Sequence, residues 1–358
     1  MIYLDYQATT PLAPEAMAAM LPWLAGPEAA GFANPHSPHR PGRAAAAAVE
    51  VARSQVAGLF PPGGTVVFTS GATEALNLAM RGCGARRMAV SAIEHAAVLD
   101  TAHAVADACR VLGVNGEGLV DPEQDFANVD LVAVMQVNNE IGTIQPVEPL
   151  ARRAHEAGAL FLCDAVQGAG RLAAPAGADM IAVSAHKLHG PKGIGALWLR
   201  EGIVLAPQLT GGGQEHGLRS GTLSPALCAG FGAAAVLALE RHDEDRAHIE
   251  HIRSIALAAL GRWTLNGSAE ARWPGNLNVR LDGLDVARLM SDLRHVAFSA
   301  GSACASGSGR SSHVLRALGL SDGQARSSLR LGFGRYTTEE EIGEATKMID
   351  AAAAAQGV

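Results

Sequence analysis

The stretch MIAVSAHKLHGPKGIGAL, residues 180–197, places one lysine between a strand-like run and a glycine-rich loop. Residues 180–183 are apolar and include β-branched side chains, which favours a buried strand. The glycines and the proline of residues 190–195 end regular structure and allow backbone to approach a ligand closely. Lys187 lies at the break, where burial or neighbouring cations would lower the pKa of its amine and let it form a Schiff base. A lone lysine in a loop is more often simply solvated, so this interpretation depends on its neighbours.

Strand-like runs also come before this stretch and alternate with longer helix-like runs. The strand-like runs are VVFT, MAVSAI, LVAVMQV, LFLCDA and MIAVSA. Alanine content and apolar spacing predict helices over 43–60 and 73–81, and Thr338 with Glu341 predicts a capping box for the last helix. A predicted helix over 225–250 becomes strongly charged, which is typical of a solvated helix leading into a second domain. The alternation predicts an α/β fold with a mostly parallel central sheet flanked by helices.

The composition excludes several classes of partner and site. The 358 residues carry a net charge of −7 without a basic block, so neither nucleic acid nor an anionic membrane surface is an expected partner. The N-terminus has no basic region, and no apolar run is long enough to span a bilayer, which predicts a cytoplasmic protein. The five cysteines lack CxxC spacing and are odd in number, which argues against a disulfide framework and a structural zinc site.

Polar residues follow successive strand-like runs. His95 follows MAVSAI, Asn139 follows LVAVMQV, and Asp164 belongs to LFLCDA. Ligands in open α/β sheets bind beyond the carboxyl ends of the strands, so these side chains are expected at one edge. The helix that starts near Thr73 offers backbone amides to a phosphate, although ordinary capping by Thr73 explains the same residue. A buried Asp164 needs a cation, either a ligand nitrogen or an arginine such as Arg171.

Three later segments carry further candidates, each with a plainer alternative. The glycine-rich loop 210–225 contains Thr222 and either holds phosphate through backbone and hydroxyls or is an ordinary loop. Cys304 lies in AGSACASGSGR, where small residues predict a mobile loop, so the thiol either travels to a substrate or is an inert surface cysteine. Arg330 in SSLRLGFGR either clamps a carboxylate through two parallel hydrogen bonds or forms a structural salt bridge.

Together these segments resemble a known enzyme family. SGATEALN, EHAAVLD, VNNEIGTIQP, DAVQ, SAHKLHGPKGIG, GGGQEHGLRSGT, SAGSAC and SSLRLGFGR are similar in order and spacing to motifs of the NifS/IscS-like cysteine desulfurases. These are class V aminotransferase relatives among the fold-type I pyridoxal phosphate enzymes, and the resemblance runs from Tyr3 to the last helix. It implies a large domain over 12–245 that binds pyridoxal 5′-phosphate. It also implies a smaller α+β domain, formed by 1–11 and 246–358, that carries the cysteine loop.

The resemblance implies roles for individual residues as well. Lys187 would hold the cofactor as the internal aldimine, and His95 would stack on its ring and assist proton transfer. Asp164 would pair with the pyridine nitrogen, and Gln167 would hydrogen-bond the ring hydroxyl. Cys304 would be the nucleophile, with possible cluster ligation through its thiol and no other metal expected. The remaining roles concern anions: Ala72, Thr73, Ser184 and His186 would hold the phosphate, Thr222 would reach the phosphate of the neighbouring subunit, and Asn139 and Arg330 would bind the substrate carboxylate.

The implied reaction removes sulfur from L-cysteine. The freed Lys187 would take the α-proton, and the Cys304 thiolate would attack the substrate sulfur. The products would be L-alanine and an enzyme persulfide, which passes to an acceptor such as an iron–sulfur scaffold. The enzyme would be a homodimer with shared active sites. Family members often continue into a tail that docks the scaffold, whereas this sequence ends at Val358, which leaves the acceptor open.

Other functions fit parts of the same pattern. A selenocysteine lyase or a class V aminotransferase would use the same fold, and an aminotransferase would need no mobile cysteine. A non-catalytic scaffold protein could also retain the fold. The combination of Lys187, Asp164 and His95 argues against that last alternative, because fold alone does not decide function and these residues carry chemistry.

Overall fold

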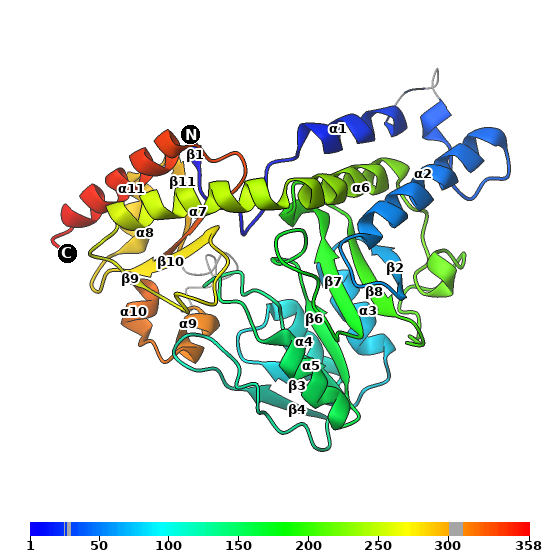
Figure 1. Cartoon of the computed structure of the whole chain (residues 1–358), viewed down its shortest axis with the longest axis horizontal. Helices are drawn as coiled ribbons and strands as arrows, with labels where there is room; N and C mark the ends of the chain where they lie inside the picture. The colour runs from blue at the N-terminus through cyan, green and yellow to red at the C-terminus, as the bar shows by residue number, and fades with distance from the viewer. Residues whose placement is uncertain (25, 27–29, 301–310) are drawn as a thin grey trace.

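The central element is a sheet of seven strands within the described part of the chain, which comprises residues 1–24, 26, 30–300 and 311–358 of the computed structural model (Figure 1). The strand order is β2-β8-β7-β6-β5-β3-β4. β8 is antiparallel to both of its neighbours, and every other pair is parallel, which confirms the predicted mostly parallel sheet. The strands are β2 Gly64–Thr69, β3 Arg87–Ser91, β4 Ala108–Leu112, β5 Leu131–Ala133, β6 Leu160–Asp164, β7 Met180–Ser184 and β8 Gly195–Arg200.

Helices cover both faces of this sheet. Alternate strand residues join different hydrophobic clusters, with Phe161 and Val183 in one and Leu162 and Ala182 in the other. This follows from the period of two along a strand. α2, α5 and α6 pack in the first cluster and α3 and α4 in the second, while α1 lies along α6 (Figure 1). The helices are α1 Pro14–Met20, α2 Arg40–Ala57, α3 Ala72–Gly82, α4 Ala96–Val105, α5 Val147–Glu156 and α6 Pro225–Glu240.

A smaller antiparallel sheet follows later in the chain, with the order β12-β13-β10-β9. Its apolar side chains form a separate cluster with those of α7, α8 and α11. The strands are β9 Thr264–Leu265, β10 Asn276–Arg280, β12 Ser299–Ala300 and β13 Ser328–Gly332, and the helices are α7 His242–Ala259, α8 Val286–Asp292, α9 His313–Ala317, α10 Asp322–Arg326 and α11 Glu339–Ala354. The predicted domain boundary at 245 and 246 falls inside α7, and the division into two domains stays a prediction.

The N-terminal segment connects this smaller sheet with the lysine loop. β1 Ile2–Tyr3 pairs in parallel with β11 Val296–Ala297 in a separate two-stranded sheet, and the Gly332 amide at the end of β13 donates to the Leu4 carbonyl at 2.8 Å. Farther on, the Thr10 amide donates to the carbonyl of His186 at 2.9 Å. Residues from the start of the sequence therefore reach the edge where the central strands end. Short 3-10 helices complete the structure: η1 Leu21–Trp23, η2 Ala30–Phe32, η3 Ala185–Lys187 and η4 Glu215–Gly217.

One predicted helix is divided into two in the structure, and the predicted capping box is present. The single helix expected over 225–250 is two helices, because α6 ends at Glu240 and α7 begins at His242, with Arg241 outside helical geometry between them. The capping box of Thr338 and Glu341 is confirmed, since both reciprocal hydrogen bonds form. No helix in the described ranges is both long and apolar enough to cross a membrane.

Candidate active site

Residues at or just after the carboxyl ends of β3, β5, β6 and β7 line a cavity of about 490 Å³. Side chains from the N-terminal segment and from β13 complete its wall. The structure therefore brings together most of the residues that the sequence singled out, although they come from distant parts of the chain. Those lining the cavity are Ala72, Thr73, His95, Asn139, Asp164, Gln167, Ser184, His186, Lys187 and Arg330.

Lys187 is the last residue of η3, directly after β7. Its Nζ donates to the backbone carbonyls of Gln7 at 2.5 Å and Ala8 at 2.8 Å. Burial, together with the charges of Arg330 and Arg171, lowers the pKa of Lys187 to about 8. An appreciable fraction of this amine is therefore unprotonated at mildly alkaline pH, as a nucleophilic lysine requires.

Asp164 ends β6 and lies buried beside the cavity. One carboxylate oxygen accepts from the Val166 amide at 3.0 Å. Burial raises the pKa of Asp164, while the charges of His95 and Lys187 act in the opposite direction. The alternative ion pair with Arg171 is not formed within the described residues, because Arg171 donates to Gln167 and to the Lys187 carbonyl instead. A cationic group in the cavity would thus find a buried carboxylate that no arginine neutralises.

His95 is the N-cap of α4, and its ring lines the cavity. Nδ1 accepts a hydrogen bond from the Ala97 amide at 3.1 Å. This contact places the proton of a neutral ring on Nε2. The helix start therefore fixes both the position and the tautomer of the imidazole.

The α3 end of the cavity has the character of an anion site. Gly71 is the N-cap of α3 and no side chain caps the helix, so capping by Thr73, the plainer alternative, is wrong. The first backbone amides of this helix have no intrahelical partner and suit an anion. β8 approaches closely here only because residue 195 is glycine: a Cβ there would lie 2.7 Å from the Gly71 backbone and 2.6 Å from the Val183 carbonyl.

His186 contributes a neutral ring to the lining of the cavity. One ring nitrogen lies 3.1 Å from Thr9 Oγ1. Burial, followed by the charges of Lys187 and Lys192, lowers the pKa of His186 to about 4. The imidazole is therefore uncharged near neutral pH and can only offer an ordinary hydrogen bond.

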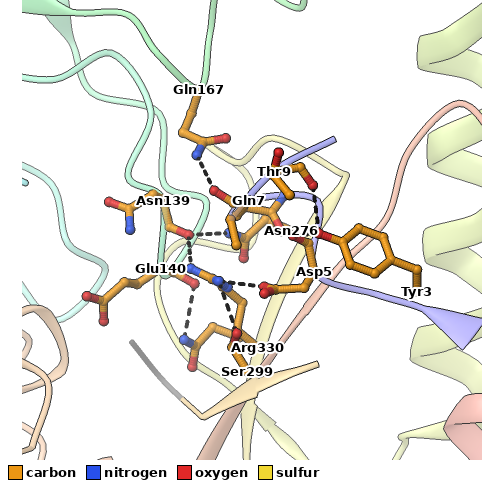
Figure 2. A network of polar contacts seen from close by, with 12 residues as sticks. Tyr3, Asp5, Gln7, Thr9, Asn139, Glu140, Gln167, Asn276, Ser299 and Arg330 are labelled. Atoms are coloured by element: carbon orange, nitrogen blue, oxygen red, sulfur yellow. Dashed lines mark hydrogen bonds and ion pairs between the residues drawn. The ribbon is translucent and has the colours of Figure 1, made fainter. Parts of the chain in front are cut away.

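Arg330 belongs to β13 and is almost completely buried. Figure 2 shows its guanidinium between two segments of the chain: Nη2 pairs with Asp5 at 2.7 Å and Nη1 donates to the Asn139 carbonyl at 3.0 Å. Ser299 Oγ lies 3.4 Å from Nη2, and Nε has no partner in the described chain. The structural salt bridge considered from the sequence therefore exists, and the same side chain also lines the cavity.

The N-terminal residues Asp5, Gln7 and Ala8 are site components that sequence reasoning missed. The Gln7 carbonyl accepts from Gln167 Nε2 at 3.0 Å (Figure 2). The same carbonyl accepts from Lys187 Nζ. The stretch LDYQATT carries no lysine, histidine or cysteine and gave no chemical signal of its own. Its contribution is mainly backbone, which only the fold reveals.

One predicted site residue does not line this cavity, and another lies outside the described residues. Thr222 is exposed and does not line it, although its loop is anchored nearby through Arg219, which pairs with Glu74 at 2.7 Å. Cys304 lies outside the described residues. No group of three or more potential metal-binding side chains occurs among the residues whose structure is described.

Comparison with known proteins gives a family. Residues 2–344 match the family described as Aminotransferase class-V. The chain belongs to this family. A curated relative named "Cysteine desulfurase IscS", from Anaeromyxobacter sp. (strain Fw109-5), is 42% identical over 371 residues, which cover 97% of this chain and 91% of the relative.

Solved structures agree with this membership of the class-V aminotransferase family. A structure described as a NifS-like protein has a TM-score of 0.89 at 30% identity and covers 99% of both chains. Another, described as "SspA in complex with cysteine", has a TM-score of 0.82 at 31% identity, covering 94% of this chain and 100% of the other. The resemblance and the fold expected from the motifs are thereby confirmed.

Proposed function

We propose that this chain is a pyridoxal phosphate-dependent cysteine desulfurase. The observation that carries the proposal is the convergence of Lys187, Asp164 and His95 on one cavity in a chain similar to curated cysteine desulfurases over almost its whole length. A non-catalytic protein would have no need to hold an amine of lowered pKa opposite a buried carboxylate.

The residues present fit pyridoxal phosphate. Asp164 would face the pyridine nitrogen and keep it protonated, Lys187 would bind the aldehyde carbon, and Gln167 would meet the ring hydroxyl. The uncapped start of α3, with Ser184 and His186, would hold the phosphate. When bound, the cofactor supplies an electron-accepting ring that stabilises a carbanion at the substrate α-carbon.

The chain's own side chains would then divide the work on L-cysteine. Asn139 and Arg330 would orient the substrate carboxylate, Lys187 would remove the α-proton, and His95 would assist proton transfer. On the sequence resemblance alone, Cys304 is proposed as the nucleophile. Its thiolate would form a bond to the substrate sulfur while the carbon–sulfur bond breaks, and the bonding pair would remain on carbon, which takes up a proton to give alanine. The persulfide would pass to an acceptor, such as an iron–sulfur scaffold.

A homodimer with shared sites is part of the proposal. The cavity has no contact with the exposed Thr222, which would instead serve the phosphate of a second copy. Large apolar side chains that are more than half exposed occur on α1, η1 and η2 and in the segment between them, and such gatherings mark interaction surfaces. These are Met17, Leu21, Leu24 and Phe32. A cytoplasmic location and the two-domain division at 12–245 and 246–358 are proposed on the sequence alone.

The test uses purified full-length protein supplied with pyridoxal phosphate, L-cysteine and a reductant. We expect a yellow protein that releases sulfide and alanine in equal amounts. Cys304→Ala should abolish both products, whereas Cys109→Ala, which alters a free cysteine on β4, should leave them unchanged. Turnover of L-cysteine that does not depend on Cys304 would indicate a lyase or an aminotransferase instead. A protein that takes up no cofactor would overturn the proposal.

A further inference from the structure

We propose that Lys192 supplies the positive charge that neutralises the phosphate of the cofactor. This inference rests on the proposed function and assigns a residue that the motifs did not single out. The chain contains three lysines, Lys187, Lys192 and Lys347. Two of them line the same cavity, although arginine is the cation used almost everywhere else in the sequence.

Charge is otherwise scarce at the α3 end of the cavity. Thr73 and Ser184 offer hydroxyls, and the start of α3 offers only the partial charge of its amides. His186 is neutral near pH 7, as its lowered pKa of about 4 requires. Arg219 is already paired with Glu74 at 2.7 Å. A phosphate dianion held by these groups alone would keep most of its charge uncompensated.

The other cations of the cavity are committed elsewhere. Arg330 pairs with Asp5 at 2.7 Å. Lys187 is hydrogen-bonded to the carbonyls of Gln7 and Ala8, and its charge would be consumed or displaced when it reacts with an aldehyde. Lys192 forms no hydrogen bond and no ion pair within the described residues, and its charge is close enough to act on His186.

The backbone around Lys192 holds it in a defined place. The Ala185 amide donates to the Ile194 carbonyl at 3.1 Å, so the loop is closed at its base. Gly190 packs tightly there, since a Cβ would lie 2.9 Å from Ala185. Gly193 has φ 87°, a left-handed conformation that favours glycine. Gly193 and Gly71 both line the cavity, and a Cβ at Gly195 would lie 2.7 Å from the Gly71 backbone, so the lysine loop lies beside the start of α3.

An ammonium in this position predicts selectivity for the phosphate group itself. A compact, mobile, always hydrated cation suits a phosphate that is partly open to solvent, because it needs no fixed fork geometry. If Lys192 instead bound the substrate carboxylate, the affinity for the cofactor would not depend on it. If Lys192 only supported the loop, its replacement would weaken the binding of phosphorylated and unphosphorylated ligands alike.

The experiment compares two ligands on cofactor-free full-length protein. Dissociation constants for pyridoxal phosphate and for pyridoxal are measured from the visible absorbance of the complex. Lys192→Gln should weaken the binding of pyridoxal phosphate by about tenfold, and this effect should become smaller as salt is added. The dissociation constant for pyridoxal should change by less than about twofold. Lys192→Arg should restore most of the affinity. Lys347→Gln, at an exposed position on α11, is the matched control and should change neither constant.

The outcomes separate this inference from the function it rests on. An unchanged constant for pyridoxal phosphate in Lys192→Gln, or equal losses for both ligands, would overturn the role of Lys192. Wild-type protein that takes up neither ligand would refute the proposed function instead. In that case calorimetry with inorganic phosphate still decides the role of Lys192, because phosphate binding that is the same in wild type and Lys192→Gln would contradict it.

Discussion

The acidity of the Lys187 ammonium is produced by its surroundings. Burial removes water from the charged form, and the Arg330 charge repels it more strongly than any other, so the pKa of Lys187 falls from 10.5 to about 8. Replacing Arg330 by Gln removes that repulsion and leaves Asp5 without its partner. Both changes favour the charged amine, so Arg330→Gln should raise the pKa of Lys187.

Competitive labelling with an amine reagent measures this shift in the cofactor-free protein. The unprotonated fraction rises ~tenfold per pH unit until the pKa is reached, so Lys187 labelling should level off just above pH 8 in the wild type and at higher pH in Arg330→Gln. Exposed Lys347 is the reference within each sample, and Arg330→Lys, which keeps the charge, should resemble the wild type. A plateau that stays in place in Arg330→Gln would show that the Arg330 charge does not set the acidity of Lys187.

Individual site residues were predictable where a reactive or polar side chain lies at the end of a predicted strand. Asp164, Ser184 and Lys187 follow apolar runs, so their meeting at the edge of the sheet could be derived from the sequence. Gln7 and Ala8 could not, because they contribute carbonyl groups and carry no side-chain signal. Their place depends on the pairing of β1 with β11, nearly three hundred residues apart in sequence, which no local pattern encodes.

At the level of elements, the loop after β8 depends on one buried carboxylate. Glu215 accepts from two nitrogens of Arg53, each at 2.7 Å, and from the Phe68 amide at 2.6 Å. It also has φ 49°, so the backbone is held in a conformation that non-glycine residues rarely adopt. This anchor fastens the loop that carries Thr222 to α2 and β2.

Glu215→Gln should lower the free energy of unfolding by about 3 kcal/mol, because it leaves the Arg53 guanidinium largely buried without its main counter-charge. Glu50→Gln is the matched control, since Glu50 pairs with the same arginine but its side chain is 64% exposed. That change should cost less than about 1 kcal/mol. Urea unfolding followed by circular dichroism measures both values. Equal effects of the two variants would mean that the loop is not held through Glu215.

Most helices and strands were predictable from the sequence, but the residues at which they begin and end were harder to predict. β6, β7 and α11 follow apolar runs or a capping box that the sequence displays. The break at Arg241 was not predicted, because no glycine or proline marks it and the charged residues on either side suit a helix. Arg241 forms ion pairs with Glu244 and Asp245 in the first turn of α7.

At the level of the whole molecule, Glu140 links the region of the central sheet to the smaller sheet. Its carbonyl accepts from Asn278 of β10 at 3.1 Å, and its carboxylate accepts from Ser312, the N-cap of α9. The side chain is almost completely buried, and burial raises the pKa of Glu140 from 4.5 to about 7. This junction therefore carries an acid that prefers its protonated form when the chain is folded.

The pH dependence of stability follows from that preference. Below pH 4.5 the group is protonated in the folded and the unfolded chain, whereas between pH 4.5 and 7 only the folded chain keeps the proton. Stability from this group is therefore lost as pH rises through that window and stays low above it. Glu140→Gln carries a neutral amide that can accept from Ser312. Between pH 4.5 and 7 its free energy of unfolding should therefore rise above that of the wild type, by up to roughly 3 kcal/mol. Urea unfolding at a series of pH values measures this difference. The control is Glu123→Gln at an exposed position, for which the free energy of unfolding should depend on pH as it does in the wild type. A difference between Glu140→Gln and wild type that is flat with pH would show that folding does not change the pKa of Glu140.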